Sequence, residues 1–270
     1  MRALLVFGHN PGPFTGKGSN AWLLPGRVPT LIDTGSGGEA FLTDLRACIA
    51  QVGSPIQVLV THGHPDHAGG ARDLAAEFPW LTFRKWPWPE SDARWPVAWS
   101  ALSDEQILDA GDGQLWVIHT PGHAPDHVCF FEPRSATLFG GDLAINGGTI
   151  VIPASRGGRL THYIESLHRV LELRPRRLLP GHGPIVEQPS ALLRGYLAHR
   201  ASRERQIVDS LGSQPATAQE LVRRIYPSLR GDLEAAARES VLAHLAKLQE
   251  EGRATQERSD SPGEGIWRVG

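Results

Sequence analysis

Four side chains that can bind a metal ion lie within one short stretch of the sequence, THGHPDH. The apolar run IQVLVT that leads into it predicts a buried strand, and the glycine and proline that follow predict a tight loop at the strand's carboxyl end. His62 and His64 can point to the same side of an extended segment, while Asp66 and His67 lie past the turn and can face the other way. The pattern indicates a metal site rather than a set of surface histidines, and the geometry suits two ions better than one.

Three further candidate ligands follow apolar strands in the same way. They are His123 in the run IHTPGH, Asp142 in TLFGGD and His182 in LLPGH. A glycine directly before each lets the backbone approach a metal or adopt a positive φ, as a site built from strand-end loops requires. All seven residues together give five histidines and two aspartates. That set is enough for two ions with an open position for solvent, as in catalytic zinc sites.

The elements that must position these residues alternate between strand and helix. Short apolar strands recur between residues 1 and 186, and helices are expected at 39–52, 71–77 and 161–173. Thr161 is the expected N-cap of the last helix, whose apolar residues are spaced for a single face. This order suggests two sheets packed face to face with helices outside, although composition alone allows other α/β layers.

The pattern changes after Ile185 to helices followed by a hairpin. The expected helices are 191–211, 217–226 and 233–251, and the expected hairpin strands are 253–260 and 266–269 around the turn 261–265. Thr217 and Glu220 form a capping box at the start of the second helix. We therefore expect a hydrolase-type domain at 1–190 and a winged-helix-like domain at 191–270.

Such a module suggests nucleic-acid binding, which needs a basic face. Residues 201–270 contain ten Lys and Arg against eleven Asp and Glu. A module that walls one side of the active site, or that forms a homodimer contact, is therefore favoured over one that binds nucleic acid.

The order of the motifs resembles that of the metallo-β-lactamase superfamily, from the run LIDTG at Leu31 to His182. The chain most resembles the lactamase-beta-two-like branch, which includes mitochondrial endoribonucleases and bacterial homologues of mostly unassigned substrate. The finer resemblance depends on the run NPGPFT ahead of GSN, the run YIESL that begins at Tyr163, and the extension after PGHGP. It implies an α/β fold, an αββα sandwich followed by a small α-helical winged-helix-like domain.

The resemblance also implies the roles of the ligands. His62, His64 and His123 would hold a first metal, Asp66, His67 and His182 a second, and Asp142 would bridge them. Two zinc ions are expected, and manganese or iron can replace them because imidazole and carboxylate suit all three. A hydroxide shared by the ions would attack the substrate, Asp66 would orient it as the catalytic residue, and Asp33 would fix a histidine tautomer.

We therefore expect a dinuclear-metal-dependent hydrolase of an ester, thioester, lactone or β-lactam bond. One alternative is an endoribonuclease or phosphodiesterase, and another is a regulatory nucleic-acid-binding protein with a vestigial metal site. A di-iron redox protein is less favoured, because those relatives usually have a glutamate where His64 stands. Gly63, where the branch commonly has a bulky residue, and the segment 146–160 depart from the family near the expected pocket.

The expected substrate contacts come from loops around the site. Lys17 lies in the loop 12–19, Arg156 and Arg159 lie in the glycine-rich run after Asp142, and Tyr163 begins the run YIESL. Five tryptophans lie between residues 80 and 99. They are expected either to form an apolar wall of the pocket or to serve in ordinary packing or a dimer contact.

Composition agrees with a cytoplasmic enzyme that acts on a small molecule. The chain has 270 residues, 40% of them hydrophobic, and a net charge of -2, which gives no overall attraction to nucleic acid or an anionic membrane. Its apolar start is too short for a signal peptide, and no membrane span is expected. Cys48 and Cys129 lie far apart and are expected to be buried thiols in a reducing compartment.

Overall fold

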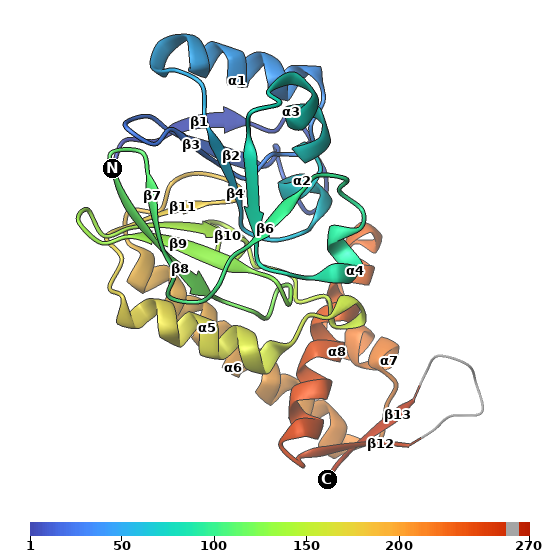
Figure 1. The fold of residues 1–270 in the computed structure, drawn as a ribbon. Helices are drawn as coiled ribbons and strands as arrows, with labels where there is room; N and C mark the ends of the chain where they lie inside the picture. The colour runs from blue at the N-terminus through green and yellow to red at the C-terminus, as the bar shows by residue number, and fades with distance from the viewer. Residues whose placement is uncertain (258–264) are drawn as a thin grey trace.

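Two β-sheets packed face to face form the centre of the molecule, seen in a computed structural model that describes residues 1–257 and 265–270 (Figure 1). The first sheet has the strand order β1-β2-β3-β4-β5-β6 and the second the order β11-β10-β9-β8-β7. The first comprises β1 (Leu4–Phe7), β2 (Asn20–Leu24), β3 (Thr30–Ile32), β4 (Gln57–Val60), β5 (Thr82–Lys85) and β6 (Trp99–Ala101). The second comprises β7 (Ile107–Ala110), β8 (Gly113–His119), β9 (Val128–Glu132), β10 (Thr137–Gly141) and β11 (Arg177–Pro180).

Helices cover the outer face of each sheet. Helices α1 (Glu39–Val52) and α3 (Ala71–Glu77) pack on the first sheet, and α5 (Leu160–Glu172) packs on the second (Figure 1). Strand β4 shows why: Val58 and Val60 face the helices, while Leu59 faces the other sheet. Both faces are buried, so the strand is an unbroken apolar run rather than an alternating one. The expected αββα sandwich is confirmed.

The register of the strands brings the candidate ligands to one edge. Strands β3, β4 and β5 are parallel, as are β10 and β11, while β9 is antiparallel to both β8 and β10. The carboxyl ends of β8, β10 and β11 and the start of β9 therefore lie at the same edge, opposite the carboxyl end of β4. Two short helices lie beside this edge, α2 (Pro65–Ala68) and α4 (Pro89–Asp92).

Helix α5 begins differently from the prediction. Arg159 is its N-cap, and the hydroxyl of Thr161 donates to Glu250 of a distant helix at 2.7 Å instead of capping its own helix. The prediction of Thr161 as N-cap is wrong, because a tertiary hydrogen bond takes the side chain that local sequence would assign to the cap.

The C-terminal region has the expected winged-helix elements. They are α6 (Pro189–Ser213), α7 (Ala218–Ile225), the 3-10 turn η2 (Gly231–Leu233), α8 (Glu234–Glu250), β12 (Ala254–Glu257) and β13 (Ile266–Val269). The capping box of Thr217 and Glu220 is present at the start of α7. Most of the predicted turn of the hairpin, 261–265, lies outside the described residues.

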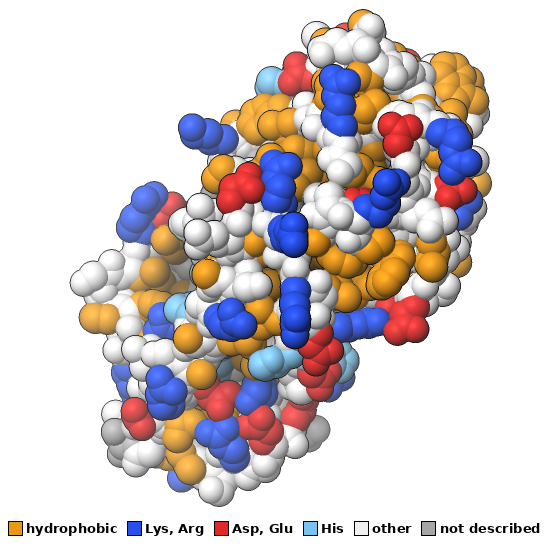
Figure 2. Space-filling view, turned by 90° about the vertical axis from the view of Figure 1, so that its left-hand side faces the viewer, with side chains coloured by type: hydrophobic (Ala, Val, Ile, Leu, Met, Phe, Trp, Pro, Cys, Tyr) orange, Lys and Arg blue, Asp and Glu red, His pale blue; other side chains and the backbone are white. Residues whose placement is uncertain are grey.

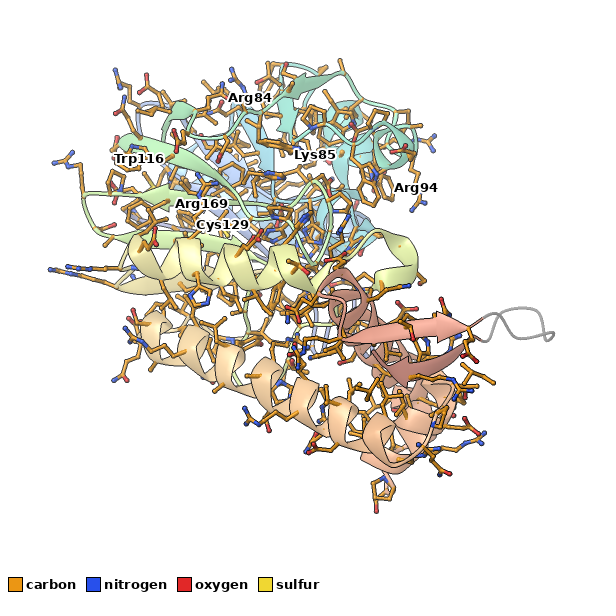
Figure 3. The ribbon with its side chains drawn as sticks, turned by 90° about the horizontal axis from the view of Figure 1, so that it is seen from below. Arg84, Lys85, Arg94, Trp116, Cys129 and Arg169 are labelled. Carbon is orange, nitrogen blue, oxygen red and sulfur yellow. The ribbon has the colours of Figure 1, made fainter. Side chains whose placement is uncertain are left out.

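Helix α6 takes part in two cores. Leu193 and Tyr196 pack with the residues between α5 and the second sheet, and Ile207 and Leu211 pack in the core of the C-terminal region. Figure 3 shows α6 running beneath α5. The division at residue 190 stays a prediction, since one continuous helix spans it.

Both cysteines are free thiols and are buried, as expected. Among the helices of the described residues, none is long and apolar enough to span a bilayer.

Candidate metal centre

The seven predicted ligands come together at the edge where the strands end. His62 and His64 follow β4, and Asp66 and His67 lie on α2. The other three come from the second sheet: His123 from the β8–β9 loop, Asp142 from the end of β10 and His182 from the end of β11. The ligand atoms form three overlapping groups, each with its atoms within 4.8 Å of one another.

The first group consists of His62, His64 and His123. Nδ1 of His64 lies 3.0 Å from Nε2 of His62 and 2.9 Å from Nε2 of His123. Three imidazole nitrogens therefore converge on one small volume.

The second group consists of Asp66, His67 and His182. Nε2 of His182 lies 3.1 Å from Oδ2 of Asp66 and 3.3 Å from Nε2 of His67. This set joins two nitrogens and a carboxylate oxygen, a common donor set for divalent transition metals.

Asp142 lies between the two groups. Its Oδ1 is 3.4 Å from Nε2 of both His67 and His182, and its Oδ2 is 3.5 Å from Nε2 of His123. Within the described part of the chain, Oδ1 is buried and has no hydrogen-bond partner. A buried, unpaired carboxylate oxygen facing two imidazoles fits a cation, because leaving it unpaired is costly otherwise. The arrangement thus fits two divalent ions, and the ligand roles themselves stay predictions.

Hydrogen bonds behind the imidazoles fix their orientation. Nδ1 of His67 lies 2.8 Å from Oδ2 of Asp33, and Asp33 also accepts from the Thr61 amide at 2.7 Å. Nδ1 of His123 lies 2.7 Å from the carbonyl oxygen of Val151. Each bond leaves Nε2 to face the centre, which is how partners behind a metal-binding histidine select its tautomer.

Burial and charge prepare the site for cations. Burial lowers the pKa of His62 well below its usual value and that of His64 to about 3, so both are neutral at pH 7. Although burial opposes it, His67 and His182 lower the pKa of Asp66 to about 2. Burial would also lower the pKa of His67, but the carboxylates of Asp66, Asp142 and Asp33 raise it well above its usual value. Three carboxylates, those of Asp33, Asp66 and Asp142, therefore lie close to His67.

The backbone of Gly63, between the first two histidines, is held by hydrogen bonds at both its N–H and its carbonyl. Its N–H donates to Oδ2 of Asp126 at 2.7 Å, and its carbonyl accepts from Oγ of Ser91 at 3.1 Å and Nε1 of Trp95 at 3.2 Å. A Cβ at position 63 would collide with the Ser91 hydroxyl, so only glycine fits there. The tryptophan-rich segment therefore packs against the metal loop.

The sequence did not indicate the residues that support the backbone of Gly63. Lys85 is fully buried and its Nζ lies 2.7 Å from both Asp126 and Asp92. In Figure 3 it lies inside the molecule, whereas Arg94 lies at the edge. The available signal was a lysine at the end of a strand with a tryptophan directly after it.

His127 is a second omission. It is fully buried, its Nε2 accepts from the Asp142 amide at 3.0 Å, and its Nδ1 lies 2.8 Å from the hydroxyl of Thr120. Burial lowers its pKa to about 3, so it stays a neutral acceptor. Gly141, with a left-handed φ of 46°, brings the chain close enough for this contact. His127 thus orients the backbone of Asp142.

The predicted substrate contacts lie in different surroundings. Tyr163 is fully buried and its hydroxyl donates to the carbonyl of Leu143 at 2.6 Å, so it packs in the core and faces no substrate. Arg159 is exposed and forms an ion pair with Glu250 at 2.5 Å. Arg156 and Lys17 are both exposed. Lys17 precedes Gly18, whose carbonyl lies 3.3 Å from Nδ1 of His182.

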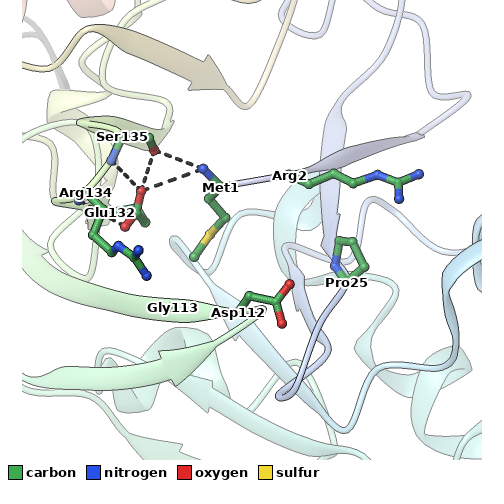
Figure 4. A pocket seen from close by; sticks show the side chains of 8 residues that line it. All are labelled: Met1, Arg2, Pro25, Asp112, Gly113, Glu132, Arg134 and Ser135. Carbon is green, nitrogen blue, oxygen red and sulfur yellow. Dashed lines mark hydrogen bonds and ion pairs between the residues drawn. The ribbon is translucent and has the colours of Figure 1, made fainter.

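A pocket of about 340 Å³ lies at the opposite end of the sheets, lined by Met1, Arg2, Pro25, Asp112, Gly113, Glu132, Arg134 and Ser135 (Figure 4). The strand register separates it from the metal ligands by the length of the sandwich. Inside it, Glu132 pairs with the N-terminal ammonium group of Met1 at 3.8 Å and accepts from the Ser135 amide at 2.8 Å.

Comparison with known proteins gives a family for both parts of the chain. A family model described as "Metallo-beta-lactamase superfamily" matches residues 14–182, and one described as "Beta-lactamase associated winged helix domain" matches residues 217–267. A relative from Drosophila melanogaster, "Beta-lactamase-like protein 2 homolog", is 32% identical over 268 residues, covering 92% of this chain and 88% of its own.

Two further similarities extend this result. "Atrochrysone carboxyl ACP thioesterase" from Passalora fulva is 30% identical over 267 residues, covering 93% of this chain and 77% of its own. The crystal structure of a metallo-beta-lactamase family protein from Thermus thermophilus is 25% identical with a TM-score of 0.79, covering 98% of each chain. The chain therefore belongs to the metallo-β-lactamase superfamily, as a metal-dependent hydrolase with a C-terminal winged-helix domain.

Proposed function

We propose that this chain is a hydrolase whose site holds two divalent metal ions, preferentially zinc, and that it cleaves a thioester or a related carbonyl bond. The position of Asp142 supports the dinuclear arrangement most directly. One of its carboxylate oxygens faces His67 and His182, and the other faces His123. A carboxylate shared in this way suits a pair of ions rather than a single one.

The residues have separate roles in this proposal. His62, His64 and His123 hold the first ion, and Asp66, His67 and His182 hold the second. Bound divalent ions would supply Lewis-acid polarisation of the scissile carbonyl and water activated at neutral pH. Asp66, with an ionised carboxylate at the rim of the cluster, accepts a hydrogen bond from the attacking water and so orients it.

Three observations support a carbonyl substrate over a nucleic acid. A relative that matches 93% of the chain is named as a thioesterase. Basic side chains form no continuous field on the face in Figure 2, where Lys and Arg are interspersed with Asp and Glu. Arg159, a candidate phosphate clamp, is already paired with Glu250.

The two buried free thiols further support a reducing, cytoplasmic compartment for the enzyme.

The test is to measure metal content and hydrolysis for the wild type and the Asp142→Asn variant. Enzyme loaded separately with zinc, manganese or iron is assayed on acyl thioesters, lactones, a chromogenic β-lactam, a phosphodiester reporter and single-stranded RNA. We expect two ions per wild-type chain and thioester hydrolysis. Asp142→Asn should lose at least one ion and lower hydrolysis roughly 100-fold or more, since even partners behind a ligand cost 10–100-fold.

Asp232→Asn is the control, because Asp232 pairs with Arg230 on the surface of the C-terminal region. Two tightly held ions in Asp142→Asn would contradict the bridging role. Efficient cleavage of RNA with no turnover of any carbonyl substrate would replace the proposed substrate class by the phosphodiester class.

A further inference from the structure

The loop that follows Asp142, residues 143–159, supports a metal ligand from behind. Its Val151 carbonyl accepts the hydrogen bond from Nδ1 of His123 at 2.7 Å. The position of His123 therefore depends on whatever holds Val151 in place.

Helix α6 holds this loop at two points. The guanidinium of Arg200 donates to the carbonyl of Ile150, directly before Val151. The hydroxyl of Tyr196, one turn earlier, lies 3.1 Å from the Ile145 amide and 3.1 Å from the Gly148 carbonyl. Helix α8 adds a third point, because Glu239 accepts from the amide of Ser155 at 2.9 Å.

The burial of the Arg200 guanidinium costs free energy, and its contact with the loop offsets that cost. Its side chain is 2% exposed, and its Nε has no hydrogen-bond partner among the described residues. Burying a charged guanidinium is unfavourable unless it is hydrogen-bonded or otherwise compensated. The compensation consists of the Ile150 carbonyl and the ring of Tyr163, which lies 5.3 Å from the guanidinium carbon.

Fixing the Ile150 carbonyl also restricts Val151. The Ile150 carbonyl belongs to the planar peptide that also contains the Val151 amide, so a bond to it fixes the position of the Val151 Cα, from which the Val151 carbonyl projects. That carbonyl in turn selects the His123 tautomer that leaves Nε2 free for the first metal group.

We propose that Arg200, assisted by Tyr196, is a positioning residue for the metal ligand His123, so that the C-terminal helices set the affinity of the first metal group. This inference rests on the proposed function, which assigns His123 to one of two bound ions. Helix α6 would then contribute to metal binding as well as to the packing of the two cores.

The test compares Arg200→Met with Arg203→Met. Arg203 lies on the same helix and also packs over an aromatic ring, 4.2 Å from that of Tyr226, and its guanidinium donates to Gln206 on its own helix rather than to the loop. Stepwise affinities are measured by titrating metal-free protein with cobalt against a chelator and following the cobalt absorption bands. We expect Arg200→Met to weaken one ion about 10–100-fold and to leave the other unchanged. Arg203→Met should leave both affinities at wild-type values.

A double-mutant cycle assigns the affected ion. In a His123→Gln background, which already lacks a ligand of the first group, Arg200→Met should cause no further loss of metal affinity. Arg200→Lys, which can still donate to the Ile150 carbonyl, should restore part of the affinity. In metal-free protein, amide exchange of residues 143–152 should be faster in Arg200→Met than in Arg203→Met.

If Arg200→Met does not fold, Tyr196→Phe is the second variant, and it should weaken the same ion by a smaller factor. Two unchanged ions, or an equal loss of both, would overturn the inference. A wild-type protein that binds fewer than two ions would instead contradict the proposed function, so the two failures are distinguishable.

Discussion

At the scale of single residues, the site depends on how closely the residues around the ligands pack as well as on the ligands themselves. Gly63 has no space for a side chain because the Ser91 hydroxyl fills it and bonds to the Gly63 carbonyl. Asp126, which Lys85 contacts, accepts from the Gly63 N–H in the preceding peptide and so completes the support of this residue. The spacing of His62 and His64 is thus set by residues that bind no metal.

We expect Gly63→Ala to weaken metal binding, because the added methyl group must displace either Ser91 or the loop. Gly63→Ala combined with Ser91→Gly should recover most of the affinity, since the second change returns the space. Ser91→Gly alone removes one hydrogen bond and should cost about 1 kcal/mol in thermal unfolding while both ions still bind. Chelator titration checks all three variants. A double variant no better than Gly63→Ala would show that strain at Asp126, not Ser91, decides the position.

The sequence predicted seven candidate ligands, which the structure brings together, and Asp33 behind His67, but it did not indicate the other supporting residues. Each of the seven follows a strand end, and the glycines beside them are local signals. Lys85, Ser91 and Asp126 lie in three separate segments that meet only in the folded protein. A lysine at a strand end normally faces solvent. The burial of Lys85 depends on the carboxylates of Asp92 and Asp126, which the sequence around Lys85 does not predict.

At the scale of elements, two threonines with similar sequence signals behave differently. Thr217 caps α7 in a capping box, as predicted, because both partners lie within one turn. Thr161 contacts Glu250 on α8 instead, so a tertiary contact replaced a local one. Capping is predictable from sequence where no other element comes within reach.

Thr217→Ala should lower the free energy of unfolding of the C-terminal region by about 1 kcal/mol, because the start of α7 loses its acceptor. Thr217→Ser, which keeps the hydroxyl, is the matched control. Urea unfolding followed by circular dichroism measures the difference. Metal affinity should not change, because the cap bonds only within its own turn and not to the loop of residues 143–159. Equal midpoints for the alanine and serine variants would contradict the role of the cap.

At the scale of the whole molecule, the winged helix and the sandwich form one working unit. Helix α6 completes the core over α5 through Leu193 and Tyr196, and α8 contacts the loop after Asp142 through Glu239. Both folds were predictable from sequence pattern. Their docking was not, because pattern shows which face of a helix is apolar but not which surface covers it.

A chain shortened to residues 1–188 should be poorly soluble and should bind the first metal weakly. It loses the apolar side chains of α6 that cover α5, together with Arg200. Size-exclusion chromatography and metal titration measure both effects, and the full-length chain is the control. A soluble, fully active short form with unchanged oligomeric state would show that the two parts are independent.

Asp142, His123 and His182 belong to the second sheet, while His62, His64, Asp66 and His67 belong to the first. Each ion in the proposed pair would therefore be chelated across the interface of the sandwich and act as a removable cross-link between its halves. The full ligand set would form only once the sheets have docked, so we expect tight metal binding to come late in folding. By mass action, free metal at 100 times its dissociation constant adds about 2.7 kcal/mol of stability per ion. Cellular metal supply would then regulate the lifetime of the protein as well as its activity.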